Sequence, residues 1–169
     1  MSDTVTEPTV SSAVERTLMP SEATEQADAR HDRVRVTVVT PERAVLNTTA
    51  EMVVLPLYDG EWAILSGHAP LVSRLGAGEL RLKNGGTVTQ RWYVEFGFVQ
   101  VRQDQVTVLT ERAMPASEVT PALVEQARSQ AQTLPASTSA ERAAKAKARD
   151  RAAGMAKVLA RNTGVTPHA

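Results

Sequence analysis

The stretch ELRLKNGGTVTQRWYV, residues 79–94, decides the fold class. Leucines at positions 80 and 82 alternate with charged residues, which is the two-residue period of a half-buried strand. Asn84-Gly85-Gly86 then supplies residues that tolerate the positive φ of a tight turn. Residues 88–94 provide the return strand, so this segment predicts an antiparallel β-hairpin.

The same kind of pattern extends on both sides of this hairpin, from residue 33 to residue 116. Alternating or short apolar runs predict further strands at residues 34–38, 44–46, 52–55, 62–65, 71–75, 98–101 and 106–109. Turn signals separate these runs, among them Thr40-Pro41-Glu42-Arg43 and Gly76-Ala77-Gly78. We therefore expect an all-β sandwich or flattened barrel of about eight to ten short antiparallel strands.

Residues 117–162 change to a helical period. Thr120 can cap a first helix with Pro121 at its first position. Thr138 and Glu141 have the spacing of a capping box for a second helix, which ends near Asn162. The expected inner stripes are Leu123, Ala127, Ala131 and Leu134 on the first helix and Ala144, Ala148, Ala152, Met155 and Leu159 on the second. A short polar connection between two helices predicts a C-terminal antiparallel helical hairpin.

The composition of this helical hairpin suggests that its docking can change. Most of the seam is alanine, and a buried methyl contributes about 0.8 kcal/mol, against about 1.5–3 kcal/mol for a leucine side chain. Gly154 costs about 1 kcal/mol inside a helix. We expect helices that form readily but hold each other and the sandwich weakly. A fixed helical appendage is the alternative.

Charge is distributed unevenly, although the chain has 19 basic and 19 acidic residues. Residues 1–33 carry seven acids and three bases, net −4, and residues 34–116 carry eight of each. Residues 117–169 carry four acids and eight bases, net +4. The second helix alone has seven bases and two acids, which favours an acidic partner, either protein or nucleic acid. The helix lacks aromatic side chains that stack on bases, which disfavours nucleic acid.

The two ends of the chain are expected to be disordered. Residues 1–32 have no sustained apolar period, so they cannot bury enough surface to offset the entropy of ordering. A docking arm anchored by Val14, Leu18 and Met19 is the alternative. Residues 163–169 follow the last helix and are also expected to form a loose terminus.

The residues give little evidence of catalytic or cofactor chemistry. The chain has no cysteine, which excludes disulfides and thiolate metal sites. Ser66-Gly67-His68 has no evident orienting carboxylate, and Asp59 with Glu61 is more typical of a turn than of a calcium site. We expect no catalytic residue, metal or cofactor. Most of the six aromatic residues are expected in strand cores. The six are Tyr58, Trp62, Trp92, Tyr93, Phe96 and Phe98. No apolar run is long enough for a membrane span.

Several motifs in this strand context resemble the epsilon subunit of F-type ATP synthases, over about residues 33–162. They are Thr40-Pro41, Val53-Val54-Leu55-Pro56, Asp59-Gly60-Glu61, Gly67-His68-Ala69-Pro70-Leu71, Leu75-Gly76-Ala77-Gly78-Glu79-Leu80, Gly97-Phe98-Val99-Gln100-Val101 and Val106-Thr107-Val108-Leu109-Thr110. The sequence departs from the family at Phe96-Gly97, where a glycine pair is usual, at Ala63 in place of glycine and at Ser66 in place of proline.

The resemblance implies a non-catalytic central-stalk subunit that couples ion-driven rotation of the c-ring to ATP synthesis. Residues 33–116 would be the docking domain on the rotor. Its contacts with the gamma subunit and the c-ring would be Asp59, Gly60 and Glu61 in one turn and Gly67, His68, Ala69, Pro70 and Leu71 in one loop. The expected location is peripheral, at the cytoplasmic face of the bacterial inner membrane. The sequence leaves proton and sodium coupling open.

The resemblance also implies that residues 117–162 are a regulatory hairpin, which inhibits ATP hydrolysis when it extends into the alpha/beta catalytic head. Contacts with acidic segments of the beta subunit would come from Arg142, Lys145, Lys147, Arg149 and Arg151. Some family members bind ATP through an Ile/Leu-Asp-x-x-Arg-Ala motif, which the nearest stretch, residues 149–153, does not match. We expect no nucleotide site. A free-standing β-sandwich that binds a ligand or protein, with a basic helical appendage, is the alternative.

Overall fold

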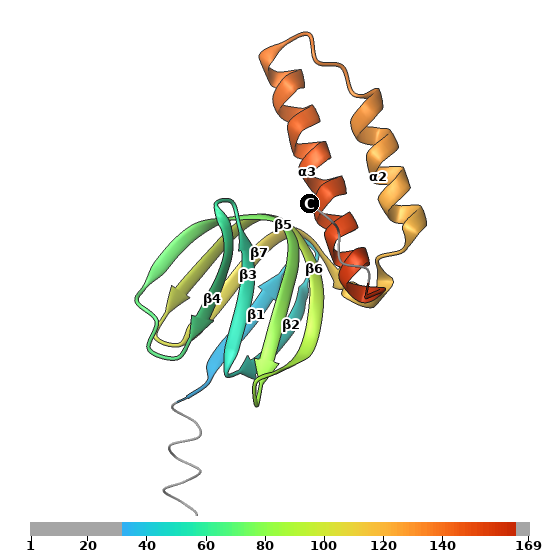
Figure 1. The fold of residues 1–169 in the computed structure, drawn as a ribbon. Helices are drawn as coiled ribbons and strands as arrows, with labels where there is room; N and C mark the ends of the chain where they lie inside the picture. The colour runs from blue at the N-terminus through green and yellow to red at the C-terminus, as the bar shows by residue number, and fades with distance from the viewer. Residues whose placement is uncertain (1–31, 165–169) are drawn as a thin grey trace, which may run out of the picture. The chain divides into compact units, whose positions relative to one another are not determined.

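The structure, a computed structural model, describes residues 32–164, and most of the two predicted tails, with Val14, Leu18 and Met19, lies outside them. Seven strands come first: β1 (Val34–Val39), β2 (Ala44–Ala50), β3 (Met52–Leu57), β4 (Gly60–Leu65), β5 (Leu71–Asn84), β6 (Thr87–Arg102) and β7 (Gln105–Pro115). The 3-10 turn η1 (Ala116–Glu118) leads to helices α2 (Pro121–Thr133) and α3 (Ser139–Asn162), as Figure 1 shows.

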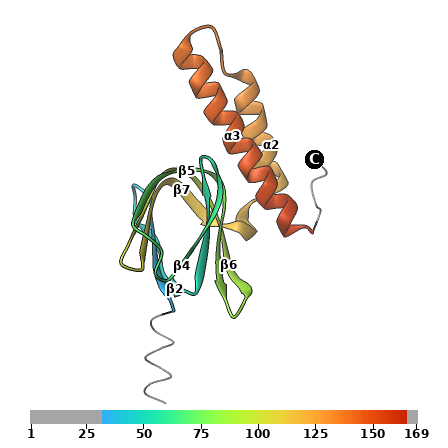
Figure 2. The same cartoon turned by 60° about the vertical axis from the view of Figure 1, so that its left-hand side comes forward.

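The strands form one hydrogen-bonded sheet in the order β2-β1-β7-β6-β5-β3-β4. The sheet folds over itself into the two layers of a sandwich (Figure 2), so the predicted fold class is confirmed. All neighbouring strands are antiparallel except β1 and β7, which run parallel. The expectation of antiparallel pairs alone is wrong here because five strands, rather than a short turn, connect β1 to β7.

The core of the sandwich is aliphatic, and alternation along the strands produces it. On β1, Val34, Val36 and Val38 are buried, whereas Arg35 between them is exposed. The other strands contribute Val53, Leu55, Leu57, Ile64, Leu75, Leu80, Leu82, Val94, Val99, Val101, Val106 and Val108. Each such side chain contributes about 1.5–3 kcal/mol when fully buried. The hairpin that the sequence predicts at Asn84-Gly85-Gly86 is confirmed, with φ of 57° at Gly85 and 74° at Gly86.

The strand number is smaller than predicted because β5 and β6 each run through residues that we expected to form breaks. Gly76-Ala77-Gly78, predicted as a turn, lies inside β5. Gly76 and Gly78 have no side chain because atoms of Pro56 and Leu57 approach them closely. A Cβ on Gly78 would lie 2.9 Å from the Cβ of Pro56, and one on Gly76 would lie 3.2 Å from the carbonyl oxygen of Leu57. In this case, glycine indicates close packing rather than a turn.

Both helices begin where the sequence predicts. The Thr120 hydroxyl accepts a hydrogen bond from the Leu123 amide, with Pro121 in the first turn. Thr138 and Glu141 form a complete capping box, and α3 ends at Asn162 as expected. Within residues 32–164, neither helix combines the length and the apolar character that a membrane crossing requires.

The predicted helix stripes are correct in part. On α3, Ala148, Ala152 and Met155 are buried as expected, whereas Ala144 is exposed and Val158, not Leu159, is fully buried. Ala152, Met155 and Val158 join a second apolar cluster that links α2 and α3 to the sandwich. Its other buried members are Tyr93, Met114, Ala116, Val119, Val124 and Ala127. The hold of α3 on the sandwich therefore includes a tyrosine, two methionines and several valines in addition to the alanine methyls.

Gly154 sets the distance between α3 and β5. A Cβ at this position would lie 2.6 Å from the carbonyl oxygen of Ala77 and 3.0 Å from its Cβ. Ala77 is the middle residue of the stretch we expected to be a turn. The sequence predicts only a loss of helix stability at Gly154. The structure shows a second effect, because the absence of a side chain lets the backbones of α3 and β5 come into contact.

We predict that Gly154→Ala destabilises the protein, although alanine favours an isolated helix by about 1 kcal/mol. The new methyl group would overlap a backbone oxygen, so α3 must move away from β5. Urea unfolding followed by circular dichroism measures the change. Ala143→Gly, at an exposed position of the same helix, is the control and should show only the ordinary helix-propensity loss. A gain in stability from Gly154→Ala would contradict the close approach.

Candidate functional site

Two carboxylates lie buried in the side of the sheet that α3 covers. Glu79 on β5 is 2% exposed and Glu95 on β6 is 3% exposed, and no other charged residue among residues 32–164 is buried. A carboxylate in such a position requires a charged partner. Each of the two receives an arginine from α3, so the contact between helix and sheet is the main concentration of buried charge in this part of the chain.

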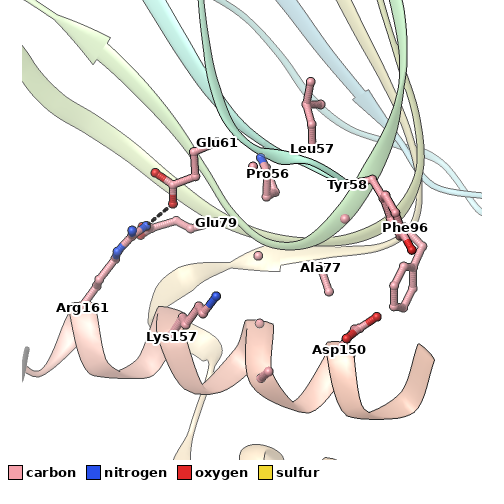
Figure 3. A pocket seen from close by; sticks show the side chains of 15 residues that line it. Pro56, Leu57, Tyr58, Glu61, Ala77, Glu79, Phe96, Asp150, Lys157 and Arg161 are labelled. Carbon is pink, nitrogen blue, oxygen red and sulfur yellow. Dashed lines mark hydrogen bonds and ion pairs between the residues drawn. The ribbon is translucent and has the colours of Figure 1, made fainter. Parts of the chain in front are cut away.

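Glu79 is held by arginines from the sheet and from α3. Arg91 on β6 donates to Oε1 of Glu79, and Arg161 donates to Oε2 at 2.8 Å. Arg161 also lies 2.9 Å from Oε1 of Glu61 on β4 (Figure 3). Arg81 on β5 donates to the other oxygen of Glu61 at 2.6 Å. One arginine of α3 thus connects to two strands at once.

The arginines also change the acidity of Glu61. Partial burial raises the pKa of this carboxyl, but the hydrogen bonds and positive charges of Arg161 and Arg81 outweigh it. The net result is a pKa below the ordinary glutamate value. Glu61 is therefore ionised at neutral pH, as the ion pairs require.

Glu95 has a different set of partners. The Tyr93 hydroxyl donates to Oε2 of Glu95 at 2.7 Å, and Nε of Arg151 on α3 donates to the same oxygen at 2.8 Å. Burial and the nearby Glu95 charge raise the pKa of Tyr93 far above its usual value. Tyr93 therefore stays protonated and remains a donor. The Thr110 hydroxyl fixes the Glu95 backbone by bonding its carbonyl oxygen.

Phe96 adds a third link between the sheet and α3. Its backbone has a φ of 49°, a conformation that is rare for an aromatic residue. The ring lies 4.7 Å from the Lys147 ammonium and 5.9 Å from the Arg151 guanidinium, which is the range of a cation–π interaction. Lys147 also pairs with Glu111 on β7. The side chains of Lys147 and Glu111 are 45% and 49% exposed, so this link is weaker than the two buried ones.

A half-open cleft of about 800 Å³ lies beside these contacts, between α3 and strands β3 and β5 (Figure 3). Its lining includes Tyr58, Glu61, Phe96, Asp150, Lys157 and Arg161. None of the described lining residues is a serine, cysteine or histidine. The described lining therefore presents charges and aromatic rings.

The two predicted docking segments lie at opposite ends of β4. Asp59-Gly60-Glu61 forms the turn from β3 into β4, and Gly67-His68-Ala69-Pro70-Leu71 follows the other end of the strand. The turn lies on the side of α3, because Glu61 pairs with Arg161. The six residues of β4 therefore separate the two segments.

The Gly67–Leu71 loop is anchored to the far end of the sandwich. The Gly67 amide donates to the Asp104 carboxylate in the β6–β7 turn at 2.7 Å, and Gly67 has a φ of 75°. The His68 ring nitrogen Nδ1 lies 2.7 Å from the carbonyl oxygen of Ala69. Ala69 and Pro70 are exposed, so this loop can meet a partner without rearrangement.

The five predicted beta-subunit contacts are mostly occupied within the chain. Arg142 and Lys145 donate to carbonyl oxygens in the α2–α3 connection and the end of α2. Lys147 and Arg151 pair with Glu111 and Glu95 as described above. Arg149 is exposed. In this arrangement α3 therefore has fewer unpaired cations available to another protein than its net charge suggests.

An exposed apolar strip, which the sequence reading missed, crosses the outer face of the sheet at Val72, Phe98 and Leu109. These side chains are 70%, 55% and 53% exposed. Phe98 on β6 pairs directly with Leu109 on β7, and Val72 on β5 is its diagonal neighbour. Three large apolar side chains close together on one face are typical of a protein interface.

Most aromatic residues are outside the core, contrary to the sequence prediction. Tyr58 is 69% exposed and stacks on Arg74 at 4.6 Å, whereas Tyr93 is the one fully buried aromatic side chain in residues 32–164. The sequence pattern does indicate that Phe98 is exposed. Val99 and Val101 alternate with Phe98 and Gln100, so a core for the valines places the phenylalanine outside.

Comparison with known proteins matches this chain to one family. The family model described as the β-sandwich domain of the ATP synthase delta/epsilon chain matches residues 33–116. The ATP synthase epsilon chain of Rhodopirellula baltica is 49% identical over 84 residues, which are 48% of this chain and 63% of that protein. The chain thus spans less than two thirds of this relative. The epsilon chain of Magnetococcus marinus is 38% identical over 99 residues, which are 59% of this chain and 72% of the relative.

A solved structure shares the fold over a longer range. A chain in the cryo-EM structure of the Euglena gracilis mitochondrial ATP synthase, OSCP/F1/c-ring, aligns with a TM-score of 0.61 and 21% identity. The alignment covers 76% of this chain and 82% of that one. That coverage exceeds residues 33–116, so the likeness of fold extends beyond the segment that the family model matches.

We predict that Glu61 makes stability depend on acid pH. Its folded pKa lies below the ordinary value of 4.5, so its contribution is complete above that value and is lost as the pH falls through the lower folded pKa. Glu61→Gln should flatten this part of the stability curve, measured by urea unfolding at a series of acid pH values. Glu125→Gln, at an exposed position of α2, is the control, and an equal flattening by both variants would contradict the assignment.

Proposed function

Because this chain belongs to the family of ATP synthase epsilon chains, we propose that it is a non-catalytic subunit of the central stalk, or rotor, of an F-type ATP synthase. In this role it couples the ion-driven rotation of the c-ring to ATP synthesis in the catalytic head. The named relatives are bacterial. The proposed location is the cytoplasmic face of the bacterial inner membrane, where the chain is peripheral and held by its partner subunits.

The observation that carries this proposal is the exposed apolar strip of Val72, Phe98 and Leu109. A subunit that transmits torque requires a broad and rigid contact, and a sheet face provides one. Arg74 and Tyr58 stack beside the strip, and arginine and tyrosine are frequent in the energetic centres of interfaces. We assign this face to the gamma subunit. Val72 directly follows the Gly67–Leu71 loop, so strip and loop form one continuous surface.

The two docking segments take different roles because they lie at opposite ends of β4. The Gly67–Leu71 loop, with His68 and the exposed Ala69 and Pro70, is proposed to contact the c-ring and the adjoining part of gamma. The Asp59–Glu61 turn contributes to rotor docking at the end nearer α3, where Glu61 already pairs with Arg161. Asp59 and Gly60 are exposed there and accessible to a partner.

The helical hairpin is proposed to regulate ATP hydrolysis. In the docked arrangement α3 lies on β5 and β6, and its cations Lys147 and Arg151 are paired with the sandwich. Extension along gamma would bring these cations, with Arg142, Lys145 and Arg149, to acidic segments of the beta subunit. The ionic character of the docking contact supports this exchange, since charged pairs can be replaced by other charged pairs of similar strength.

We predict that the purified chain binds the gamma subunit and that Phe98→Glu weakens this binding by about tenfold or more, because a charge would be buried in an apolar contact. A pull-down and a titration by light scattering or calorimetry measure it. Val88→Glu, at another exposed valine near the β5–β6 turn, should have little effect. Absence of gamma binding by the unsubstituted chain would favour the alternative, a free-standing binding module.

We predict that deleting residues 117–169 raises ATP hydrolysis by the assembled enzyme several-fold and leaves assembly intact, because the sandwich retains its own core. The triple variant with alanine at positions 142, 145 and 149 tests the charge contribution: inhibition should weaken and depend less on salt. Unchanged hydrolysis after the deletion would disprove the inhibitory role while leaving the rotor role in place.

A further inference from the structure

We infer that Glu95 of the sandwich and the acidic partner of the extended hairpin compete for the same cation, Arg151, so that docking of α3 and inhibition exclude each other at this residue. The inference rests on the proposed regulatory function and adds the residue that decides between the two positions. Lys147 is shared in the same way, at lower strength, between Glu111 and the partner.

The sandwich-facing residues of α3 form one helical face. Lys147, Arg151, Gly154, Val158 and Arg161 follow one another at spacings of four, three, four and three residues. Gly154 fixes the closest approach to β5, and Arg151 and Arg161 lie on either side of it. Docking therefore uses cations that stand on the same face as the packing contact, and a docked helix cannot offer these cations to a second protein.

The two buried carboxylates differ in what remains when α3 leaves. Glu79 keeps Arg91, which comes from the sheet, so its charge stays compensated. Glu95 has one cation within ion-pair distance in the described part of the chain, and that cation is Arg151 of α3. Its other side-chain partner is the neutral hydroxyl of Tyr93. Glu95 therefore attracts α3 with its full charge, whereas Arg91 already neutralises part of the charge with which Glu79 attracts the helix.

Two side chains of the sandwich hold Glu95 in place, which makes it an effective competitor. Tyr93 orients its carboxylate, and the Thr110 hydroxyl holds its backbone on β6. Arg151 binds through Nε, and Phe96 lies under its guanidinium. A preformed acceptor loses little entropy when the cation arrives. An acidic segment on another subunit must replace this acceptor before it can use Arg151.

The first part of the test measures docking in the isolated full-length chain. The chain has no native cysteine, so Val88→Cys and Ser137→Cys place two spin labels, one on the sandwich and one between the helices. Distance distributions then give the undocked fraction. Glu95→Gln and Arg151→Gln should each raise the undocked-to-docked ratio on the order of tenfold, the loss of one charge-assisted hydrogen bond.

Two matched variants sharpen the docking measurement. Arg161→Gln removes an arginine from the same face of α3 but leaves Glu79 with Arg91, so its effect should be smaller than that of Arg151→Gln. Glu118→Gln changes an exposed acid on η1 and should have no effect. If Glu95→Gln disturbs the fold of the sandwich, Arg151→Gln still measures the loss of this ion pair, because it leaves the sandwich sequence unchanged. Equal effects of the two arginine variants, or no release by either Glu95→Gln or Arg151→Gln, would overturn the role of Glu95.

The second part measures ATP hydrolysis by the enzyme assembled with each variant. Glu95→Gln removes the competitor and keeps Arg151, so inhibition should become several-fold stronger. Arg151→Gln releases the helix equally but lacks the shared cation, so inhibition should not increase to the same extent. Equal strengthening by both, or no strengthening by Glu95→Gln, would overturn the competition. The deletion of residues 117–169 distinguishes failure of the inhibitory function from failure of the proposed competition. If the deletion does not raise hydrolysis, the inhibitory function is rejected. The spin-label distances still decide the docking role of Glu95 in that case.

Discussion

Gly154 brings the backbone of α3 against β5, and the other contacts of the helix with the sheet depend on that distance. A Cβ at this position would lie 2.6 Å from the Ala77 carbonyl oxygen. With the helix so close, Arg151 and Arg161 reach Glu95 and Glu79 through direct hydrogen bonds of 2.8 Å. A helix held further away would reach these carboxylates only through water, and Glu95, whose ion-pair partner comes from α3, would lose its compensating charge.

The docking contact combines two forces with different properties. The apolar cluster around Met155 and Val158 contains no charge interaction for salt to screen, and because apolar burial is non-directional it does not select one partner over another. The ion pairs are partly shielded from solvent, so salt weakens them less than it weakens surface pairs, and they are selective for an acidic surface. Selectivity of this kind suits a helix that is proposed to have two alternative acidic partners, one on its own chain and one on another subunit.

Local chemistry made much of this fold predictable from the sequence. The Asn84-Gly85-Gly86 turn, the capping box at Thr138 and the alternating valines of β1 each depend on neighbours within a few residues. The parallel β1–β7 pair, the continuous β5 and the exposed Phe98 depend on residues far away in the sequence. The candidate site was less predictable for the same reason. Glu95 and Glu79 have the pattern of ordinary strand acids until Arg151 and Arg161 of α3, 56 and 82 residues later in the chain, are placed on them.

The parallel pair also constrains how the chain folds during synthesis. β1 lies between β2 and β7 in the sheet, and its register with β7 extends from Arg35–Gln105 to Val39–Leu109. The ribosome must therefore release nearly the whole sandwich before β1 obtains its second neighbour, and the backbone N–H and C=O groups along one edge of β1 lack their sheet partners until then. Closure of so long a loop makes the sandwich a slow folding unit of high contact order. The two helices follow the sandwich in the chain and pair with each other locally, so they meet a finished surface on which to dock.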